Sequence, residues 1–134
     1  MFSLTIQSLK DKAIEQHSDT FSKAVKKRNK LLVAKDERKY IAAVKKVDDL
    51  FHKIYIGNHS FHLATGERLL QLDIRGTIVD LCNRNQILSL EATEKLLDQI
   101  QNTRARRGGR KRANQLIKLL ELALKLKEPI HCTW

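Results

Sequence analysis

The chain has 134 residues, of which 42% are hydrophobic and 31% charged, and its formal net charge is +11. This length and composition, with one Pro and five Gly, predict a single globular domain over residues 1–134 and exclude extensive disorder. No apolar run is long enough to span a membrane, and the first residues lack the cationic flank of a signal peptide, so we expect a cytoplasmic protein.

The apolar spacing is helical almost throughout, and no segment shows a convincing strand period. The prediction is an all-α fold, a compact bundle of four to six helices. A first helix is expected to include Leu4, Ile6 and Ile14, with either a break or a kink at residues 17–20, where apolar residues are absent.

The clearest pattern lies between residues 36 and 56. One helical face there carries Tyr40, Val44, Val47, Phe51 and Ile54, which predicts a buried face. The glycine at position 57 is expected to end this helix. A preceding helix that contains residues 21–32 either runs straight into this one or ends before it.

Three further helices are expected in the second half of the chain. The first contains apolar residues from Leu63 to Leu81, and the second begins near Leu90 with Ser89 as its N-cap. The last runs from about Arg110 to Lys127 and is apolar around much of its circumference. So wide an apolar arc predicts a central position in the bundle or a homo-oligomer interface.

The six residues after the last helix begin with Pro129 and end with Trp134. Two interpretations are open. The tail folds back so that Trp134 covers the bundle, or it docks a partner, since an exposed Trp is a favoured contact residue in interfaces.

The most informative stretch is residues 104–112, which we call the arginine elbow. Six of its nine residues are cationic and surround a Gly–Gly pair: Arg104, Arg106, Arg107, Arg110, Lys111 and Arg112. Guanidinium groups donate paired hydrogen bonds to phosphate oxygens, so the cluster predicts phosphate recognition at the bend between two helices. An acidic protein or anionic lipid is the second hypothesis, and a solvated loop is the third.

A second basic cluster, which we call the lysine stripe, shares one side of the helix that contains residues 21–32. It consists of Lys23, Lys26, Lys27 and Lys30. The stripe either extends the arginine elbow or is an ordinary solvated face. Few aromatic residues accompany either cluster, which favours contact with phosphates over stacking on bases.

The sequence gives little support for a metal site or for catalysis. His52, His59 and His62, with Cys82, lack the paired spacing of zinc ligands, so no metal or cofactor is predicted. No nucleophile elbow or phosphate-cradling glycine loop is recognisable, and we expect no enzyme. Cys82 and Cys132 follow no redox pattern and are expected to be reduced thiols.

These patterns predict a non-enzymatic binding protein that contacts the phosphates of DNA or RNA through the arginine elbow. The alternative is a protein-interaction adaptor, inhibitor or secretion-system component whose basic surface docks an acidic partner. Self-association through the last helix is a further expectation.

Overall fold

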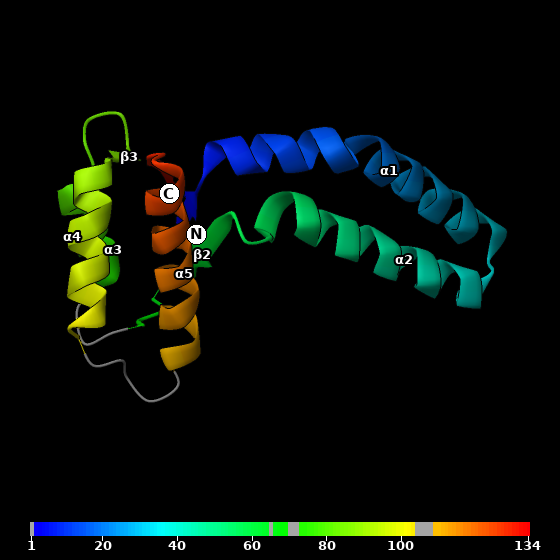
Figure 1. The fold of residues 1–134 in the computed structure, drawn as a ribbon. Coiled ribbons are helices and arrows are strands. Elements are labelled where there is room, and N and C mark those ends of the chain that lie inside the picture. The colour runs from blue at the N-terminus through cyan, green and yellow to red at the C-terminus, as the bar shows by residue number, and fades with distance from the viewer. Residues whose placement is uncertain (1, 65, 70–72, 104–108) are drawn as a thin grey trace. The chain divides into compact units, whose positions relative to one another are not determined.

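The computed structural model describes residues 2–64, 66–69, 73–103 and 109–134. Within these residues the protein is mostly helical, with five α-helices and a small four-stranded antiparallel sheet (Figure 1). The prediction of a mostly helical protein is confirmed. The small sheet was not predicted, so the all-α fold class is only roughly right. The chain divides into two compact units, residues 8–57, here the hairpin unit, and residues 1–7 with 58–134, here the sheet unit. That the whole chain folds as a single domain stays a prediction.

The hairpin unit is built from α1 (Gln7–Ala34), α2 (Glu37–Phe51) and a π-helical turn, η1 (His52–Ile56). Helix α1 passes through residues 17–20 without interruption, so of the two alternatives expected there, a break or a kink, the break is wrong. Residues 18–20 lie on the exposed side of the helix, where polar side chains are tolerated. Helices α1 and α2 are separate, because Lys35 adopts a positive φ of 56° and Asp36 caps α2 by accepting a hydrogen bond from the backbone N–H of Lys39.

The core of the hairpin unit is small. Ala24 of α1 packs with Val47 and Leu50 of α2, and Phe21 and Val25 lie against this cluster. The predicted buried face is confirmed at Val47 of α2 and Ile54 of η1, whereas Phe51 is 46% exposed and makes tilted ring contacts with Tyr55 and Phe21.

The sheet joins both ends of the chain to its middle. Its strands are β1 (Phe2–Thr5), β2 (Ser60–Leu63), β3 (Ile87–Leu88) and β4 (Ile130–Thr133), in the order β2-β1-β4-β3. Leu4 of β1 is paired with Phe61 on one side and Cys132 on the other. The prediction that Leu4 and Ile6 belong to a helix is therefore wrong. Both are buried, as is Phe2, and this alternation is the period of a strand with one buried face.

Three helices complete the sheet unit: α3 (Ile74–Leu81), α4 (Leu90–Gln101) and α5 (Arg110–Leu126). The predicted start of α4 is confirmed, because the Ser89 hydroxyl accepts a hydrogen bond from the backbone N–H of Ala92 over 3.2 Å. The segment predicted as one helix from Leu63 to Leu81 is instead strand β2, a connection and α3, which starts after the N-cap Asp73.

Helix α5 lies beside α4 and also contacts β2 (Figure 1). Its apolar arc is buried within the chain at five positions: Ala113, Leu116, Leu119, Leu120 and Ala123. The central position predicted for this helix is thus found within the sheet unit, while self-association stays a prediction. In the part of the chain that the structure describes, no helix is long and apolar enough to cross a membrane.

The C-terminal tail folds back as strand β4, between β1 and β3. Trp134 stacks on Phe2, with ring centroids 5.5 Å apart and ring planes inclined by 15°. Trp134 remains 43% exposed. Of the two interpretations of the tail, the structure favours the one in which it packs on its own chain.

Candidate nucleic-acid interface

The arginine elbow connects the last turn of α4 to the first turn of α5. Arg104, Arg106 and Arg107 lie outside the described residues. Arg110, Lys111 and Arg112 form the first turn of α5, where Arg110 and Lys111 are exposed and Arg112 is half-buried. The structure therefore places three of the six cations on a helix with defined neighbours.

The start of α5 is electrostatically unlike the starts of α2, α3 and α4. Asp36, Asp73 and Ser89 each cap one of those helices with a side-chain oxygen that accepts a backbone N–H. The N-cap of α5 is Gly109, which offers no side-chain oxygen, and the first turn of α5 contains no acidic residue. Because a helix N-terminus carries partial positive charge and free N–H groups, the cations here add to an already positive end.

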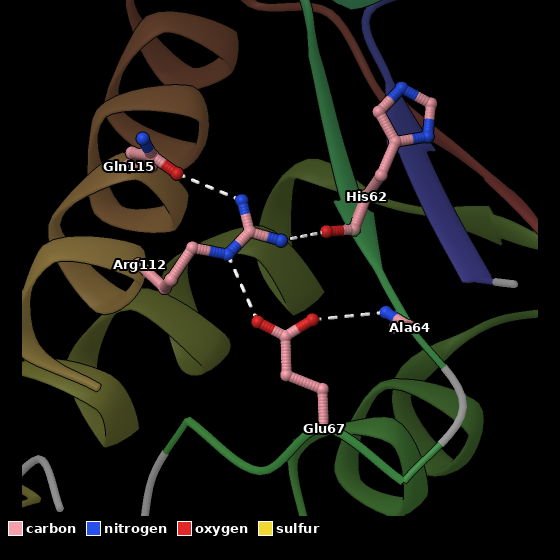
Figure 2. A network of polar contacts seen from close by, with 5 residues as sticks. All are labelled: His62, Ala64, Glu67, Arg112 and Gln115. Carbon is pink, nitrogen blue, oxygen red and sulfur yellow. Dashed lines mark hydrogen bonds and ion pairs between the residues drawn. The ribbon is translucent and has the colours of Figure 1, made fainter. Parts of the chain in front are cut away.

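Arg112 differs from its two neighbours because its guanidinium is engaged within the sheet unit (Figure 2). Its Nε donates to Glu67 Oε1 over 3.1 Å, its Nη1 donates to Gln115 Oε1 over 2.9 Å, and its Nη2 donates to the carbonyl oxygen of His62. The guanidinium carbon also lies 4.6 Å from the centre of the Phe61 ring. These contacts fix the start of α5 to β2 and to the segment after it.

Glu67 is the acidic partner in this network, and it is not among the site residues predicted from the sequence. Its Oε2 accepts a hydrogen bond from the backbone N–H of Ala64 over 3.0 Å. That hydrogen bond, and then the interaction with Arg112, hold the pKa of the Glu67 carboxyl below its ordinary value. Glu67 and Arg112 are 45 residues apart in the chain, so no local sequence pattern indicates the pair.

The sequence prediction treats all six elbow cations alike, whereas the structure separates Arg112 from Arg110 and Lys111. A guanidinium that donates to a carboxylate, an amide and a carbonyl has few donors left for a phosphate. Arg112 is therefore engaged within the sheet unit, whereas Arg110 and Lys111 in the same turn are exposed.

The lysine stripe belongs to the hairpin unit. Lys23, Lys26, Lys27 and Lys30 are all exposed on α1, whereas Ala24, between them in the sequence, is buried. The whole hairpin unit carries thirteen Lys and Arg against seven Asp and Glu. The stripe is thus part of a helical hairpin with a cationic surface of its own.

The three histidines considered as metal ligands have different surroundings. His52 is exposed in the hairpin unit, whereas His59 and His62 belong to the sheet unit. His59 is buried, with its Nδ1 2.8 Å from the Ser60 hydroxyl oxygen. Over the described ranges of the chain, no group of three or more His, Cys, Asp or Glu side chains is arranged to hold a metal ion.

Known proteins give no further guide to this site. No protein-family model, no curated protein and no solved structure matches the chain. The assignment of a function therefore rests on the residues themselves and on their geometry.

Proposed function

We propose that the protein is a non-enzymatic binding protein that holds nucleic-acid phosphates at the arginine elbow. The observation that supports this most is the start of α5, where a helix with no side-chain cap and no acidic residue in its first turn opens on Arg110, Lys111 and Arg112. A bound phosphate would supply the negative charge that Asp36, Asp73 and Ser89 supply as partial or full charges at the starts of α2, α3 and α4.

This surface favours contact with the sugar–phosphate backbone of a nucleic acid over contact with its bases. Arg110 and Lys111 are exposed and long enough to reach phosphate oxygens, and the arginines at 104, 106 and 107 add three more cations to the same connection. Aromatic residues for base stacking are absent from residues 104–112. We therefore expect weak sequence preference and strong salt dependence.

The lysine stripe is proposed as a secondary contact. Its four exposed ammonium groups follow one face of α1 and provide diffuse attraction to a polyanion, with less geometric specificity than guanidinium forks. Its loss should weaken binding less than loss of the elbow arginines.

The proposal is tested by titrating the full-length protein into labelled duplex DNA and RNA at several salt concentrations. Without Arg112, the elbow offers five cations, so the logarithm of the duplex DNA binding constant should fall with the logarithm of the salt concentration with a slope of about −4.5. Protein purified at low salt should also carry nucleic acid that high salt removes. No binding to either polymer at low salt would refute the proposed function.

A second candidate function, docking of an acidic protein, is supported by one feature of the hairpin unit. Leu32, Val33 and Ile41 lie near the connection between α1 and α2 and are 59%, 83% and 66% exposed. Basic residues accompany them at positions 30, 35, 38 and 39. Exposed apolar residues among cations suit a partner surface that is both apolar and acidic.

The two functions are separated by a pull-down from nuclease-treated lysate with the wild-type chain and a Val33→Ser, Ile41→Ser variant. The adaptor hypothesis predicts a stoichiometric protein that survives nuclease treatment and is lost with this variant. The nucleic-acid proposal predicts that captured material disappears with nuclease and that the variant captures as much as wild type.

A further inference from the structure

We propose that Cys82 and Cys132 are a thiol pair that forms a reversible disulfide within the sheet unit. Their Sγ atoms are 3.0 Å apart, although the residues are fifty positions apart in the chain. Both cysteines are free thiols in this structure. This inference is independent of the proposed nucleic-acid function.

The backbone on both sides holds the two thiols in place. Cys132 lies in β4, between β1 and β3, and its backbone N–H donates to the carbonyl oxygen of Gln86 over 2.9 Å. Cys82 follows directly after α3, and its N–H donates to the carbonyl oxygen of Ile78 over 2.9 Å. The contact between the sulfurs is therefore a consequence of hydrogen-bonded secondary structure on both sides.

The short connection between the two sites is also well fixed. The Asn83 side-chain oxygen accepts hydrogen bonds from the backbone N–H groups of Asn85 and Ile87 over 3.0 and 3.1 Å. Ile87 is then paired with His131, the neighbour of Cys132 in β4. This turn ties the end of α3 to β4, so the two thiols remain neighbours as long as the sheet is formed.

The two thiols have different roles in the exchange. Cys82 is half-buried and accessible, whereas Cys132 is 4% exposed, and burial, followed by hydrogen bonding to Cys82, raises the pKa of the Cys132 thiol. Cys82 is thus the thiol that reacts first with an external oxidant. Cys132 is the thiol that completes the bond.

The oxidant is a low-molecular-weight disulfide such as glutathione disulfide. The Cys82 thiolate attacks one of its sulfurs, the sulfur–sulfur bond breaks, and one glutathione thiolate leaves with the electron pair. Cys132 then loses its proton to solvent and attacks Cys82 Sγ, which releases the second glutathione thiolate. Two protein thiols are oxidised to one disulfide, one small disulfide is reduced to two thiols, and the two protons released by the cysteines are taken up by the glutathione thiolates.

The bond would close a covalent loop that contains α4, the arginine elbow and α5. Closing a loop of this length restricts the unfolded chain and stabilises the folded state, provided that the native sulfurs are already in position. The oxidised protein should therefore unfold at a temperature about 10 °C higher than the reduced protein.

The experiment incubates the full-length, reduced protein with glutathione disulfide at neutral pH, followed by denaturation, alkylation and mass spectrometry. The expected product is a monomer that has lost two hydrogen atoms and takes up no alkyl groups, and a reducing agent should restore two alkylatable thiols. Cys82→Ser and Cys132→Ala variants should yield no such product, because each keeps only one cysteine.

The intramolecular disulfide together with a higher Tm supports the proposal. Two persistent free thiols, glutathione adducts that do not resolve, or disulfides only between chains would overturn it. An intramolecular bond that lowers the Tm would overturn it as well, because the native thiols would then not be positioned for the bond.

Discussion

The guanidinium of Arg112 and the carboxylate of Glu67 form an ion pair with an Nε to Oε1 distance of 3.1 Å. The pair links the first turn of α5 to the segment after β2, and the same guanidinium donates to the His62 carbonyl and lies over the Phe61 ring. It therefore holds the cationic end of α5 against the sheet. The neighbours Arg110 and Lys111 remain exposed and carry the proposed ligand contacts.

This division of roles predicts different effects of two single substitutions. Arg112→Ala should lower the free energy of unfolding by about 2 kcal/mol, because it removes the hydrogen bonds to the Glu67 carboxylate and the His62 carbonyl and the packing on Phe61. Arg110→Ala should change stability by less than about 0.5 kcal/mol. Urea unfolding measures both. Equal stability of the two variants would show that the Arg112 network contributes nothing.

Glu67 predicts a specific dependence of stability on pH. The hydrogen bond from Ala64 and the interaction with Arg112 lower the pKa of Glu67 from its ordinary value of 4.5. The ionised carboxylate of Glu67 therefore stabilises the folded state. The resulting stability is fully present above pH 4.5 and is lost as the pH falls through the lowered pKa of the folded state. In Glu67→Gln this part of the acid dependence should disappear. A variant whose stability falls with acid as steeply as wild type would contradict the assignment.

Ser89 predicts the stability of the start of α4. Its hydroxyl accepts the Ala92 N–H over 3.2 Å, so Ser89→Ala should lower the free energy of unfolding by about 1 kcal/mol. Ser89→Asp is the matched control, because Asp can cap the helix as well and should retain most of the stability. Circular dichroism during thermal unfolding compares them. If Ser89→Asp lowers stability as much as Ser89→Ala, loss of the helix cap does not explain the destabilisation.

The stack of Trp134 on Phe2 predicts that the tail contributes to the sheet unit. Trp134→Ala should lower the free energy of unfolding by about 1 kcal/mol, since aromatic pairs at this distance contribute beyond their buried area. Trp134→Phe should retain most of this stabilisation. Because Trp134 is the single Trp, wild-type fluorescence reports the tail directly and should shift to longer wavelength on unfolding. An emission spectrum that is unchanged by denaturant would show that the tail is already undocked.

The helices were largely predictable because their signals are local. Ser89 indicates the start of α4, and the long apolar pattern defines α5 within a residue or two. The strands were missed because each has at most four residues, too few for a period to stand out. The alternation of Phe2, Leu4 and Ile6 was the available signal, but Leu4 and Ile6 also suit a helical face with the residues after them. Residues 2–5 form a strand because they pair with residues 60–63 and 130–133, which are far away in the sequence.

The candidate site divides in the same way. The basic composition of residues 104–112 is visible in the sequence, and so is its place before α5. The separate role of Arg112 is not visible in the sequence, because it depends on Glu67 and His62, which are 45 and 50 residues away. The contact of Cys82 with Cys132 is likewise created by the fold, since it requires β4 to lie beside the turn after α3.

The measurement that tests the central claim most directly is nucleic-acid affinity after charge reversal at the arginine elbow. The test variant is Arg106→Glu, Arg107→Glu, Arg110→Glu. The control is Lys12→Glu, Lys45→Glu, Lys118→Glu, which changes the net charge equally at three exposed positions on α1, α2 and α5. Both are compared with wild type by fluorescence anisotropy on the same duplex, over a range of salt concentrations.

The elbow variant should bind about a hundredfold more weakly than wild type, and the slope of its log binding constant against log salt concentration should be shallower by about 3. The control should lose far less affinity. Thermal unfolding should show both variants folded. Equal losses in the two variants would mean that net charge and not the elbow attracts the polyanion, and wild-type affinity in the elbow variant would contradict the proposed site.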